Sequence, residues 1–305
     1  MTIEIIGPEA EKRLSWDGLT EALLAGHKLP PAQVEDTLLT RGGDKLLSRA
    51  AWIDGMGLAV KSATIFPANA GLGLPSVNGS VSLFSDTSGE LEALVDFHLV
   101  TKWKTAGDSL LAAKLLARPD SRFFLIVGAG AVARSMIEAY RSAFPAAQFL
   151  LWNRTFSKAA EMAAEIPGVS SVRDLEGAVR SADVICTATM STAPIIHGSW
   201  IKKGTHLDLI GAYTPEMREV DDKTLQRARI FVDSRATTMG HIGELKIPIE
   251  EGVIDRTEVL ADFYDIERGK FARRDADEIT LSKNGGGAHL DLMTARYILE
   301  AARRK

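Results

Sequence analysis

From Arg122 onward, short apolar runs alternate regularly with segments of helical periodicity. Phe123–Val127 has the composition of a buried strand, and Ala131–Phe144 has the spacing of an amphipathic helix. Strands that alternate with helices predict a parallel sheet with right-handed crossovers and helices on both faces. The later elements expected from the same pattern are strands at Gln148–Trp152, Asp183–Thr187, His206–Gly211 and Ile230–Asp233, and helices at Ser157–Glu165, Leu175–Ala182 and Asp221–Arg229.

The first part of the chain has a different pattern. A polar, helical start is followed by strand-like runs at Gly57–Phe66 and Ser80–Phe84, with a glycine- and proline-rich loop, Pro67–Gly79, between them. The last stretch, Ala288–Arg303, is an amphipathic helix that no strand follows, and we expect it to pack on the N-terminal domain. The sequence therefore predicts an α/β protein with a doubly wound Rossmann domain over 118–287 and a smaller α+β substrate-binding and dimerisation domain over 1–117 and 288–305.

Composition narrows the class of protein. Hydrophobic residues make up 46% of the 305 residues, as in a globular enzyme, and a net charge of −4 argues against a nucleic-acid partner. The single cysteine, Cys186, excludes an intramolecular disulfide and a multi-cysteine metal site. The chain begins without a basic and then apolar signal segment, and no apolar run approaches the roughly 20 residues of a membrane span. We expect a cytoplasmic protein without a membrane partner.

The strongest local motif is a dinucleotide-binding fingerprint. It directly follows the strand at 123–127 and opens the next helix, which is the context its mechanism requires. Gly128 permits the tight turn, Gly130 lets a pyrophosphate approach the backbone, and Ala133 allows close helix–strand packing. Ala129, Ala131 and Val132 complete the expected phosphate-binding turn. The alternative is an ordinary strand–turn–helix that binds no ligand.

The end of the second strand bears on which dinucleotide binds. About 25 residues after the fingerprint, an NAD-binding chain carries an acidic residue for the ribose 2′-hydroxyl. Here Asn153, Arg154 and Thr155 occupy this region, and none of them repels a 2′-phosphate. Arg154 either pairs with that phosphate or is a solvated charge at a strand end. This region favours NADPH, with NADH as the second possibility.

Lys61 is the most informative residue outside the fingerprint. It is the only charged residue between Asp54 and Asp86, and it lies within a strand-like run, where a lysine is costly without an anionic partner. A substrate carboxylate is one such partner; the alternative is a lysine that extends from an edge strand into solvent. No GxSxG or HExxH motif is present, and the pair His206 and Asp208 offers too few ligands for a metal, so no metal site is expected.

Together these residues resemble the ornithine cyclodeaminase/mu-crystallin family. The resemblance runs over most of the chain through a collinear set of segments: Lys61, Gly73–Asp96, Thr101–Ala106, Gly128–Gly130, His206–Ala212, Val232–Ser234 and Thr280–Lys283. It implies a Rossmann domain and an N-terminal domain that forms the substrate pocket and a homodimer interface. Members of this family are cyclodeaminases, an alanine dehydrogenase and reductases of cyclic ketimines.

Departures from the family pattern favour the reductases. Tyr213 stands where cyclodeaminases carry an acidic residue, and Asn153-Arg154 resembles the NADPH-consuming ketimine reductases. The segments 211–219 and 283–291 are most similar to bacterial reductases of Δ1-pyrroline-2-carboxylate, which form L-proline, often in hydroxyproline breakdown. The resemblance therefore implies NAD(P)H-dependent reduction of a cyclic imino acid.

The resemblance also implies a set of site residues. The substrate carboxylate is expected at Arg41, Lys61 and Lys104, where Lys104 replaces a family arginine, with Thr105 beside them. Lys61 or a bound water is expected to support the proton on the imine nitrogen, with Asp291 as an electrostatic partner. The carboxyl ends of the parallel strands supply further cofactor contacts: Thr187, Ala188, Thr189, Met190, Ile210, Gly211 and Ser234.

Three other functions remain open from the sequence. They are an alanine-dehydrogenase-like activity on a 2-oxo acid with ammonia, ornithine cyclodeamination, and a non-enzymatic, crystallin-like NADPH-binding protein. Five- and six-membered imines, giving L-proline or L-pipecolate, differ by one methylene. That difference is worth only about 1–3 kcal/mol, so the sequence does not separate the two substrates.

Overall fold

The structure, a computed structural model, describes residues 3–304. In it the chain forms two compact units. The sheet unit comprises Met1–Lys104 and Gly286–Lys305, and the Rossmann unit comprises Thr105–Gly285. Helix α2 (Phe97–Leu116) is continuous across the division. The division therefore falls inside a helix, whereas the sequence pattern placed it after residue 117.

The sheet unit contains a six-stranded sheet in the order β1-β6-β5-β4-β3-β2. Strands β2 to β6 are antiparallel, and β1 pairs in parallel with β6. The strands are β1 (Glu4–Ile6), β2 (Gln33–Arg41), β3 (Asp44–Ile53), β4 (Gly57–Ile65), β5 (Val77–Phe84) and β6 (Leu91–Asp96); the helices are α1 (Trp16–Gly26) and α9 (Ala288–Arg303), with the 3-10 turns η1 (Pro8–Arg13) and η2 (Pro67–Leu72).

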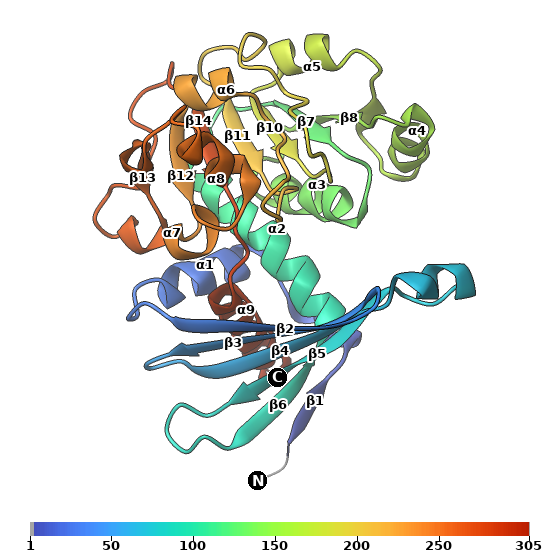
Figure 1. Cartoon of the computed structure of the whole chain (residues 1–305), viewed down its shortest axis with the longest axis vertical. Helices are drawn as coiled ribbons and strands as arrows, with labels where there is room; N and C mark the ends of the chain where they lie inside the picture. Colours follow the sequence, from blue (N-terminus) through green and yellow to red (C-terminus); the bar gives the residue numbers. More distant parts are fainter. Residues whose placement is uncertain (1–2, 305) are drawn as a thin grey trace. The chain divides into compact units, whose positions relative to one another are not determined.

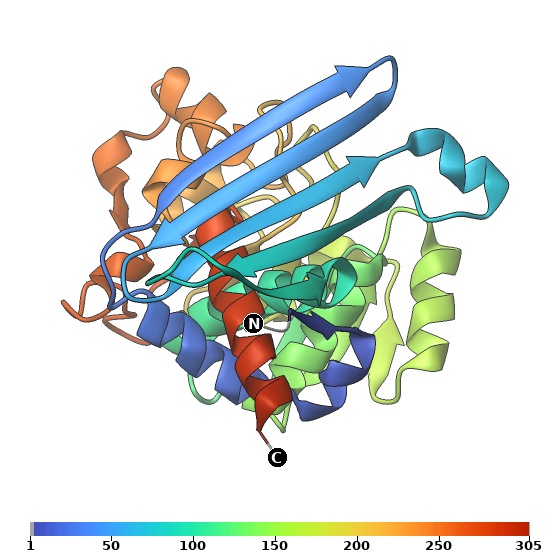
Figure 2. The same cartoon turned by 90° about the horizontal axis from the view of Figure 1, so that it is seen from below.

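One face of this sheet is buried and the other is open. Small and aliphatic side chains alternate along β3 and β4, so that Ile53, Ala59 and Ala63 point to the buried face. Figure 2 shows α9 crossing that face, which confirms that the C-terminal helix packs on the N-terminal part of the chain. Trp52 on the opposite face is 46% exposed.

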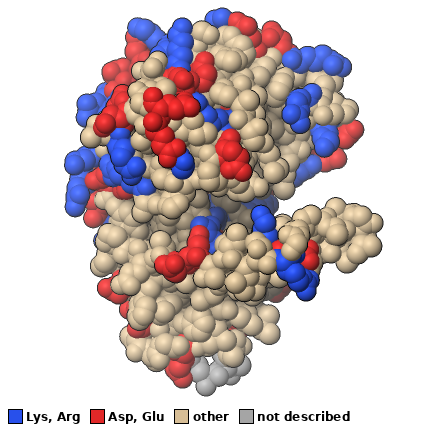
Figure 3. Space-filling model, viewed as in Figure 1, with Lys and Arg blue, Asp and Glu red and all other residues tan. Residues whose placement is uncertain are grey.

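The loop predicted at 67–79 contains regular secondary structure. It contains η2 and the first residues of β5, and it projects as an arm with Leu72 and Leu74 exposed. No charged residue occurs between Lys61 and Asp86, and the projecting arm in Figure 3 is accordingly tan at its tip.

The Rossmann unit contains an eight-stranded parallel sheet with helices on both faces (Figure 1). Its strands are β7 (Phe123–Val127), β8 (Gln148–Trp152), β9 (Val169–Ser171), β10 (Val184–Thr187), β11 (His206–Leu209), β12 (Arg229–Val232), β13 (Val259–Ala261) and β14 (Thr280–Lys283). Its helices are α3 (Ala131–Ala143), α4 (Phe156–Glu165), α5 (Leu175–Ser181), α6 (Asp222–Arg227), α7 (Arg235–Thr238) and α8 (Gly243–Glu250), with 3-10 turns η3 (Arg256–Glu258) and η4 (Phe263–Asp265).

The strand order indicates which edge of this sheet would suit a ligand. The order is β13-β12-β14-β11-β10-β7-β8-β9, so the chain runs outward from β7 on one side through β8 and β9, and on the other through β10 and β11. Ligands of doubly wound sheets bind at the carboxyl ends of the strands where the order reverses, which here is between β7 and β10. The predicted fold class is confirmed.

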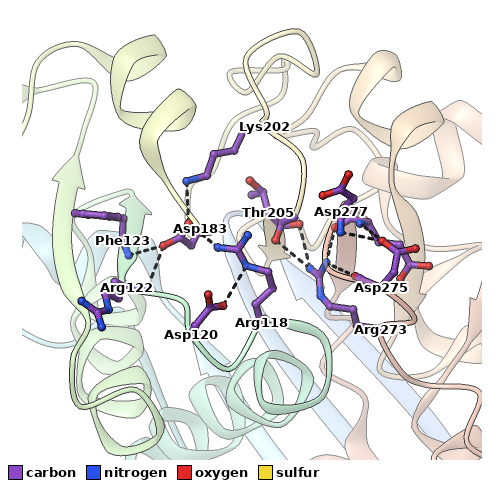
Figure 4. Close-up of polar contacts among 12 residues, drawn as sticks. Arg118, Asp120, Arg122, Phe123, Asp183, Lys202, Thr205, Arg273, Asp275 and Asp277 are labelled. Carbon is purple, nitrogen blue, oxygen red and sulfur yellow. Dashed lines mark hydrogen bonds and ion pairs between the residues drawn. The ribbon is translucent and has the colours of Figure 1, made fainter.

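Ion pairs and hydrogen bonds to the backbone stabilise the opposite, amino-terminal end of the Rossmann sheet (Figure 4). Asp183 accepts hydrogen bonds from the backbone N–H groups of Arg122 and Phe123, 2.9 and 3.0 Å long, and pairs with Lys202 at 2.8 Å. Arg273 donates to the carbonyls of Leu116 and Gly204 and so joins three segments of this end.

Within residues 3–304, no helix has the length and apolar character needed to cross a membrane.

Candidate functional site

The turn between β7 and α3 has the geometry of a phosphate-binding turn. Gly128 has φ +118°, and a Cβ there would lie 2.4 Å from the Ala188 carbonyl oxygen, so only glycine fits. A Cβ on Gly130 would meet no atom within 4 Å, which leaves its backbone open to a ligand. Gly130 caps α3 without a side-chain hydrogen bond to the first turn. The N-terminal N–H groups of a 13-residue helix therefore remain available to an anion.

The other residues of this turn differ in exposure. Ala129 is half-buried and Ala131 and Val132 are exposed, whereas Ala133 is fully buried against the sheet. Small side chains at these positions leave space above the helix N-terminus. The residues present therefore fit the pyrophosphate of a dinucleotide.

The residues after β8 also lie at the carboxyl end of the sheet. Asn153 donates from its side chain to the Thr155 carbonyl at 2.9 Å, which orders the turn. Arg154 is exposed, and its side chain makes no hydrogen bond or ion pair with any residue of the described chain. A guanidinium without an internal partner is available to a phosphate group of a ligand.

The segments after β10 and β11 are held by a buried carboxylate that the sequence reasoning missed. Glu219 is 0% exposed and accepts hydrogen bonds from the Thr187 hydroxyl at 2.8 Å and from the N–H and hydroxyl groups of Thr189 at 2.8 and 2.6 Å. It also accepts from the backbone N–H groups of Gly211 and Ala212, at 2.9 and 3.2 Å. Glu219 lies in the segment 211–219, which contributes only to the family resemblance, and its position after a loop gives no sign of burial.

Other buried ionisable groups lie close to Glu219. Glu244 accepts from the backbone N–H groups of Glu219 and Val220 at 2.8 and 3.1 Å. Burial and the nearby charge of Glu219 raise the pKa of Glu244. Lys283 at the end of β14 is fully buried; burial lowers its pKa despite the attraction of Glu219 and Glu244. Two carboxyl groups and one ammonium group thus share this interior.

The remaining predicted cofactor residues lie at the same edge with different exposure. Ala188 and Ile210 are half-buried, and Met190 is 74% exposed. Ser234 follows β12 and donates its backbone N–H to the Asp233 side chain at 2.7 Å. These residues all follow parallel strands, so they lie at the carboxyl-terminal edge of the sheet, where doubly wound sheets bind their ligands.

The sheet unit contains a buried cluster of cations around Asp291. Lys61 on β4 donates to the Asp291 Oδ1 atom at 2.9 Å and to the Thr101 hydroxyl at 2.8 Å. Lys104, one turn after Thr101 on α2, lies 3.8 Å from the same carboxylate oxygen and donates to the Gly286 carbonyl at 3.1 Å. Both lysines are buried, at 6% and 7% exposure, so neither extends into solvent as an edge lysine would.

Asp291 is ionised by this environment. Burial alone would raise its pKa, but the positive charges of Lys104, Lys61 and Arg49 outweigh burial and hold the pKa below its ordinary value. Its second oxygen, Oδ2, is buried and accepts no hydrogen bond from the described residues. Burial and the charge of Lys104 lower the pKa of His289 to about 4, so this histidine is neutral at pH 7.

The structure brings Arg49, and not Arg41, to the cluster. In the sheet register Arg49 is directly opposite Lys61, and it donates to the Gly286 carbonyl at 2.8 Å. Arg41 pairs with Asp44 at the β2–β3 turn, and its side chain is 83% exposed. Successive side chains of a strand alternate between faces, and this register puts Arg41 on the face away from Lys61. The alternation of β3 could have identified Arg49 had the strand been recognised.

The surroundings of Thr105, Tyr213 and the Lys61 ammonium group complete the description of the site. Thr105 is half-buried on α2 directly after Lys104 and belongs to the Rossmann unit. Phe97, at the start of α2, lies under the Lys61 ammonium group at 4.8 Å from the ring centre. Tyr213 is 61% exposed. Among residues 3–304, no group of His, Cys, Asp and Glu side chains has the arrangement of a metal site.

Comparison with known proteins places these features in a family. The model of the ornithine cyclodeaminase/mu-crystallin family matches residues 50–305. A Delta(1)-pyrroline-2-carboxylate reductase of Paracoccus denitrificans is 49% identical over 296 residues, covering 95% of this chain and 94% of that protein.

Two solved structures show the same architecture. One is the Thermococcus litoralis Delta(1)-pyrroline-2-carboxylate reductase in complex with NADH and L-proline, with a TM-score of 0.89 and 29% identity over 98% of this chain and 97% of that one. The other is an archaeal alanine dehydrogenase dimer with bound NAD, with a TM-score of 0.89 and 29% identity over 99% of this chain and 96% of that one.

Proposed function

The chain belongs to the ornithine cyclodeaminase/mu-crystallin family, and on that premise we propose that it reduces Δ1-pyrroline-2-carboxylate to L-proline with a reduced nicotinamide dinucleotide. The observation that carries this proposal is the buried cluster of Lys61, Lys104 and Arg49 around Asp291. It combines cations for a carboxylate with one anion for a protonated imine. The 49% identical reductase supports the same substrate class.

Lys61 and Lys104 would hold the substrate carboxylate. An ammonium group has three N–H donors, and those of Lys61 that the described residues use go to Thr101 and Asp291. A further donor of Lys61 is therefore available to the substrate. Arg49 adds a third positive charge, although Asp36 pairs with it at 2.9 Å and offsets part of that charge.

Asp291 would stabilise the positive charge of the imine. An imine accepts electrons at carbon most readily when its nitrogen is protonated, and a buried, ionised carboxylate favours the protonated form. The Oδ2 atom of Asp291 offers an acceptor for that N–H, because no described residue donates to it. Lys61 then serves two purposes: it holds the substrate and keeps Asp291 ionised.

NADPH, when bound, supplies the hydride for C2 of the ring. Gly128 and Gly130 would hold its pyrophosphate at the N-terminus of α3. Arg154 would pair with the 2′-phosphate, which is the reason to prefer NADPH to NADH. The two similar solved structures contain NADH and NAD, so this preference depends on Arg154 and on the absence of an acidic residue at 153–155.

We also propose a homodimer formed through the open face of the six-stranded sheet. This face carries a groove of about 480 Å³ lined largely by apolar side chains: Ala50, Trp52, Leu58, Val60 and Phe84. Apolar side chains on an exposed sheet face favour association.

A cytoplasmic location and a place in hydroxyproline breakdown remain predictions from the sequence.

An alanine-dehydrogenase-like activity is the second candidate, because the archaeal alanine dehydrogenase has the same TM-score as the reductase. Cyclodeamination is disfavoured because Tyr213 stands where the family resemblance implies the acidic residue of cyclodeaminases. A non-enzymatic NADPH-binding protein would leave the buried cation cluster without a use.

Absorbance at 340 nm, with each dinucleotide and each substrate in turn, separates these functions. Loss of NADPH with Δ1-pyrroline-2-carboxylate alone is the expected result. Turnover only with pyruvate and ammonium would move the assignment to an amino-acid dehydrogenase, and no turnover with any substrate would refute a reductase.

A further inference from the structure

Glu219 is a buried residue of the Rossmann unit to which the proposed reaction gives no role. It is inaccessible to solvent, and both of its oxygens accept hydrogen bonds: Oε1 from Thr189, and Oε2 from Thr187, Gly211 and Ala212. A buried group with every acceptor satisfied does not touch a ligand. Its effect on any reaction must therefore pass through the segments it holds.

Only a carboxylate satisfies these donors. Backbone N–H groups and hydroxyl groups converge on both oxygens, so a glutamine side chain would direct its own N–H₂ group at one set of donors. The cost of burying the negative charge is offset by these five hydrogen bonds and by Lys283. Glu244 fixes the backbone of Glu219 itself.

The two segments that Glu219 binds, after β10 and β11, pack closely against each other and against the glycine turn after β7. A Cβ on Gly211 would lie 2.3 Å from both the backbone nitrogen and the carbonyl oxygen of Thr189, and one on Gly128 would lie 2.4 Å from the Ala188 carbonyl oxygen. The segments after β7, β10 and β11 therefore form one packed edge. A displacement of Thr189 or Gly211 would change the surface beside the fingerprint.

The strand order assigns this edge to one half of the dinucleotide. Asn153 and Arg154, the residues suited to the adenosine ribose, follow β8 on one side of β7, whereas the segments held by Glu219 follow β10 and β11 on the other. A dinucleotide that binds across the reversal in strand order places its two halves on opposite sides of β7. The nicotinamide half then lies on the side that Glu219 orders.

We propose that Glu219 is a positioning residue that holds Thr187–Thr189 and Gly211–Ala212 in the conformation that binds the nicotinamide half of the dinucleotide. This inference rests on the proposed function, because it takes the ligand to be NADPH or NADH. It assigns Glu219 no contact with substrate or cofactor.

The test compares Glu219→Gln with a matched control, Asp183→Asn. Asp183 is also a buried carboxylate that accepts two backbone N–H hydrogen bonds, but it lies at the amino-terminal end of the sheet (Figure 4). Hydrogen exchange of the protein without ligand would be measured at the amides of Thr189, Gly211 and Ala212. Calorimetric titrations with NADPH and with 2′-phospho-ADP-ribose, which lacks the nicotinamide, would complete the comparison.

For Glu219→Gln we expect at least about 10-fold faster exchange at these amides and at least about 10-fold weaker binding of NADPH. Binding of 2′-phospho-ADP-ribose should change by less than about 3-fold. Asp183→Asn should lower thermal stability without either effect. Equal losses for both ligands, or the same NADPH loss in Asp183→Asn, would overturn the proposal, because either result indicates a general structural role.

A second variant covers the case in which Glu219→Gln does not fold. Thr187→Val keeps the size of the side chain and removes one of the five hydrogen bonds, so a smaller loss in the same direction is expected, about 3-fold for NADPH. Unchanged NADPH affinity and exchange in Thr187→Val would count against the proposal. Because these measurements need no imino acid, they test Glu219 even if the wild-type protein fails to reduce Δ1-pyrroline-2-carboxylate.

Discussion

Removal of the Asp291 charge should destabilise the protein by about 3 kcal/mol. The carboxylate is 1% exposed, is hydrogen-bonded to Lys61 at 2.9 Å and lies 3.8 Å from Lys104. Loss of one partner from a buried ion pair costs about 3–5 kcal/mol, because the other charge stays buried without compensation. In Asp291→Asn an oxygen still accepts from Lys61, so we expect the lower end of that range. Urea unfolding followed by tryptophan fluorescence at pH 7 would measure the loss.

The pH dependence of this loss is a second check on the same reasoning. The folded-state pKa of Asp291 is lowered, so its contribution to stability is fully present above the unfolded pKa, near 4, and is lost as pH falls through the folded pKa. The difference in unfolding free energy between wild type and Asp291→Asn should therefore be constant from about pH 5 to pH 8 and shrink below about pH 4. The control, Asp36→Asn, removes an exposed partner of Arg49 and should cost less than about 1 kcal/mol. Equal losses for the two variants would refute the reasoning.

Three further predictions concern ligand binding. In steady-state assays, Arg49→Met should raise the KM for the imino acid by about 10-fold or more, whereas Arg41→Met should change it by less than about 2-fold. Similar KM changes in the two variants would contradict the assignment of Arg49 to the cluster. Arg154→Ala should raise the KM for NADPH by about 10-fold and leave that for NADH within about 2-fold, and an equal rise for both would remove the case for a 2′-phosphate contact. Gly128→Ala should lower the melting temperature, because the added Cβ would meet the Ala188 carbonyl oxygen. Gly130→Ala should keep the melting temperature of the wild type and lose about 10-fold in dinucleotide affinity, measured by calorimetry. A normal melting temperature for Gly128→Ala would show that this close approach is not required.

The sequence predicted the Rossmann unit well because its signals are local. An apolar strand such as Phe123–Val127 and the glycine turn after it carry their own periodicity and turn chemistry, and both were found as predicted. The strand Thr280–Lys283 was missed as an element because it is short and ends in a lysine. Its membership of the sheet depends on pairing with β11 and β12, which lie far away in the sequence.

The candidate site was harder to predict because its residues meet through long-range contacts. Lys61 was found from its apolar surroundings, and Asp291 entered only through the family resemblance. Arg41 entered only through the family resemblance. Arg49 was not considered, because β2 and β3 were not recognised and a register is needed to tell the two faces of a strand apart. Glu219 was missed because burial of a glutamate after a loop leaves no periodic signal.

Transfer of deuterium tests the central claim most directly. Wild-type protein, Δ1-pyrroline-2-carboxylate and NADPH deuterated at the transferable C4 position would be incubated, and the product would be analysed by mass spectrometry and NMR. We predict L-proline with one deuterium at Cα. Proline without deuterium, or no proline while the protein binds NADPH, would contradict the assignment of this chain as an imino-acid reductase.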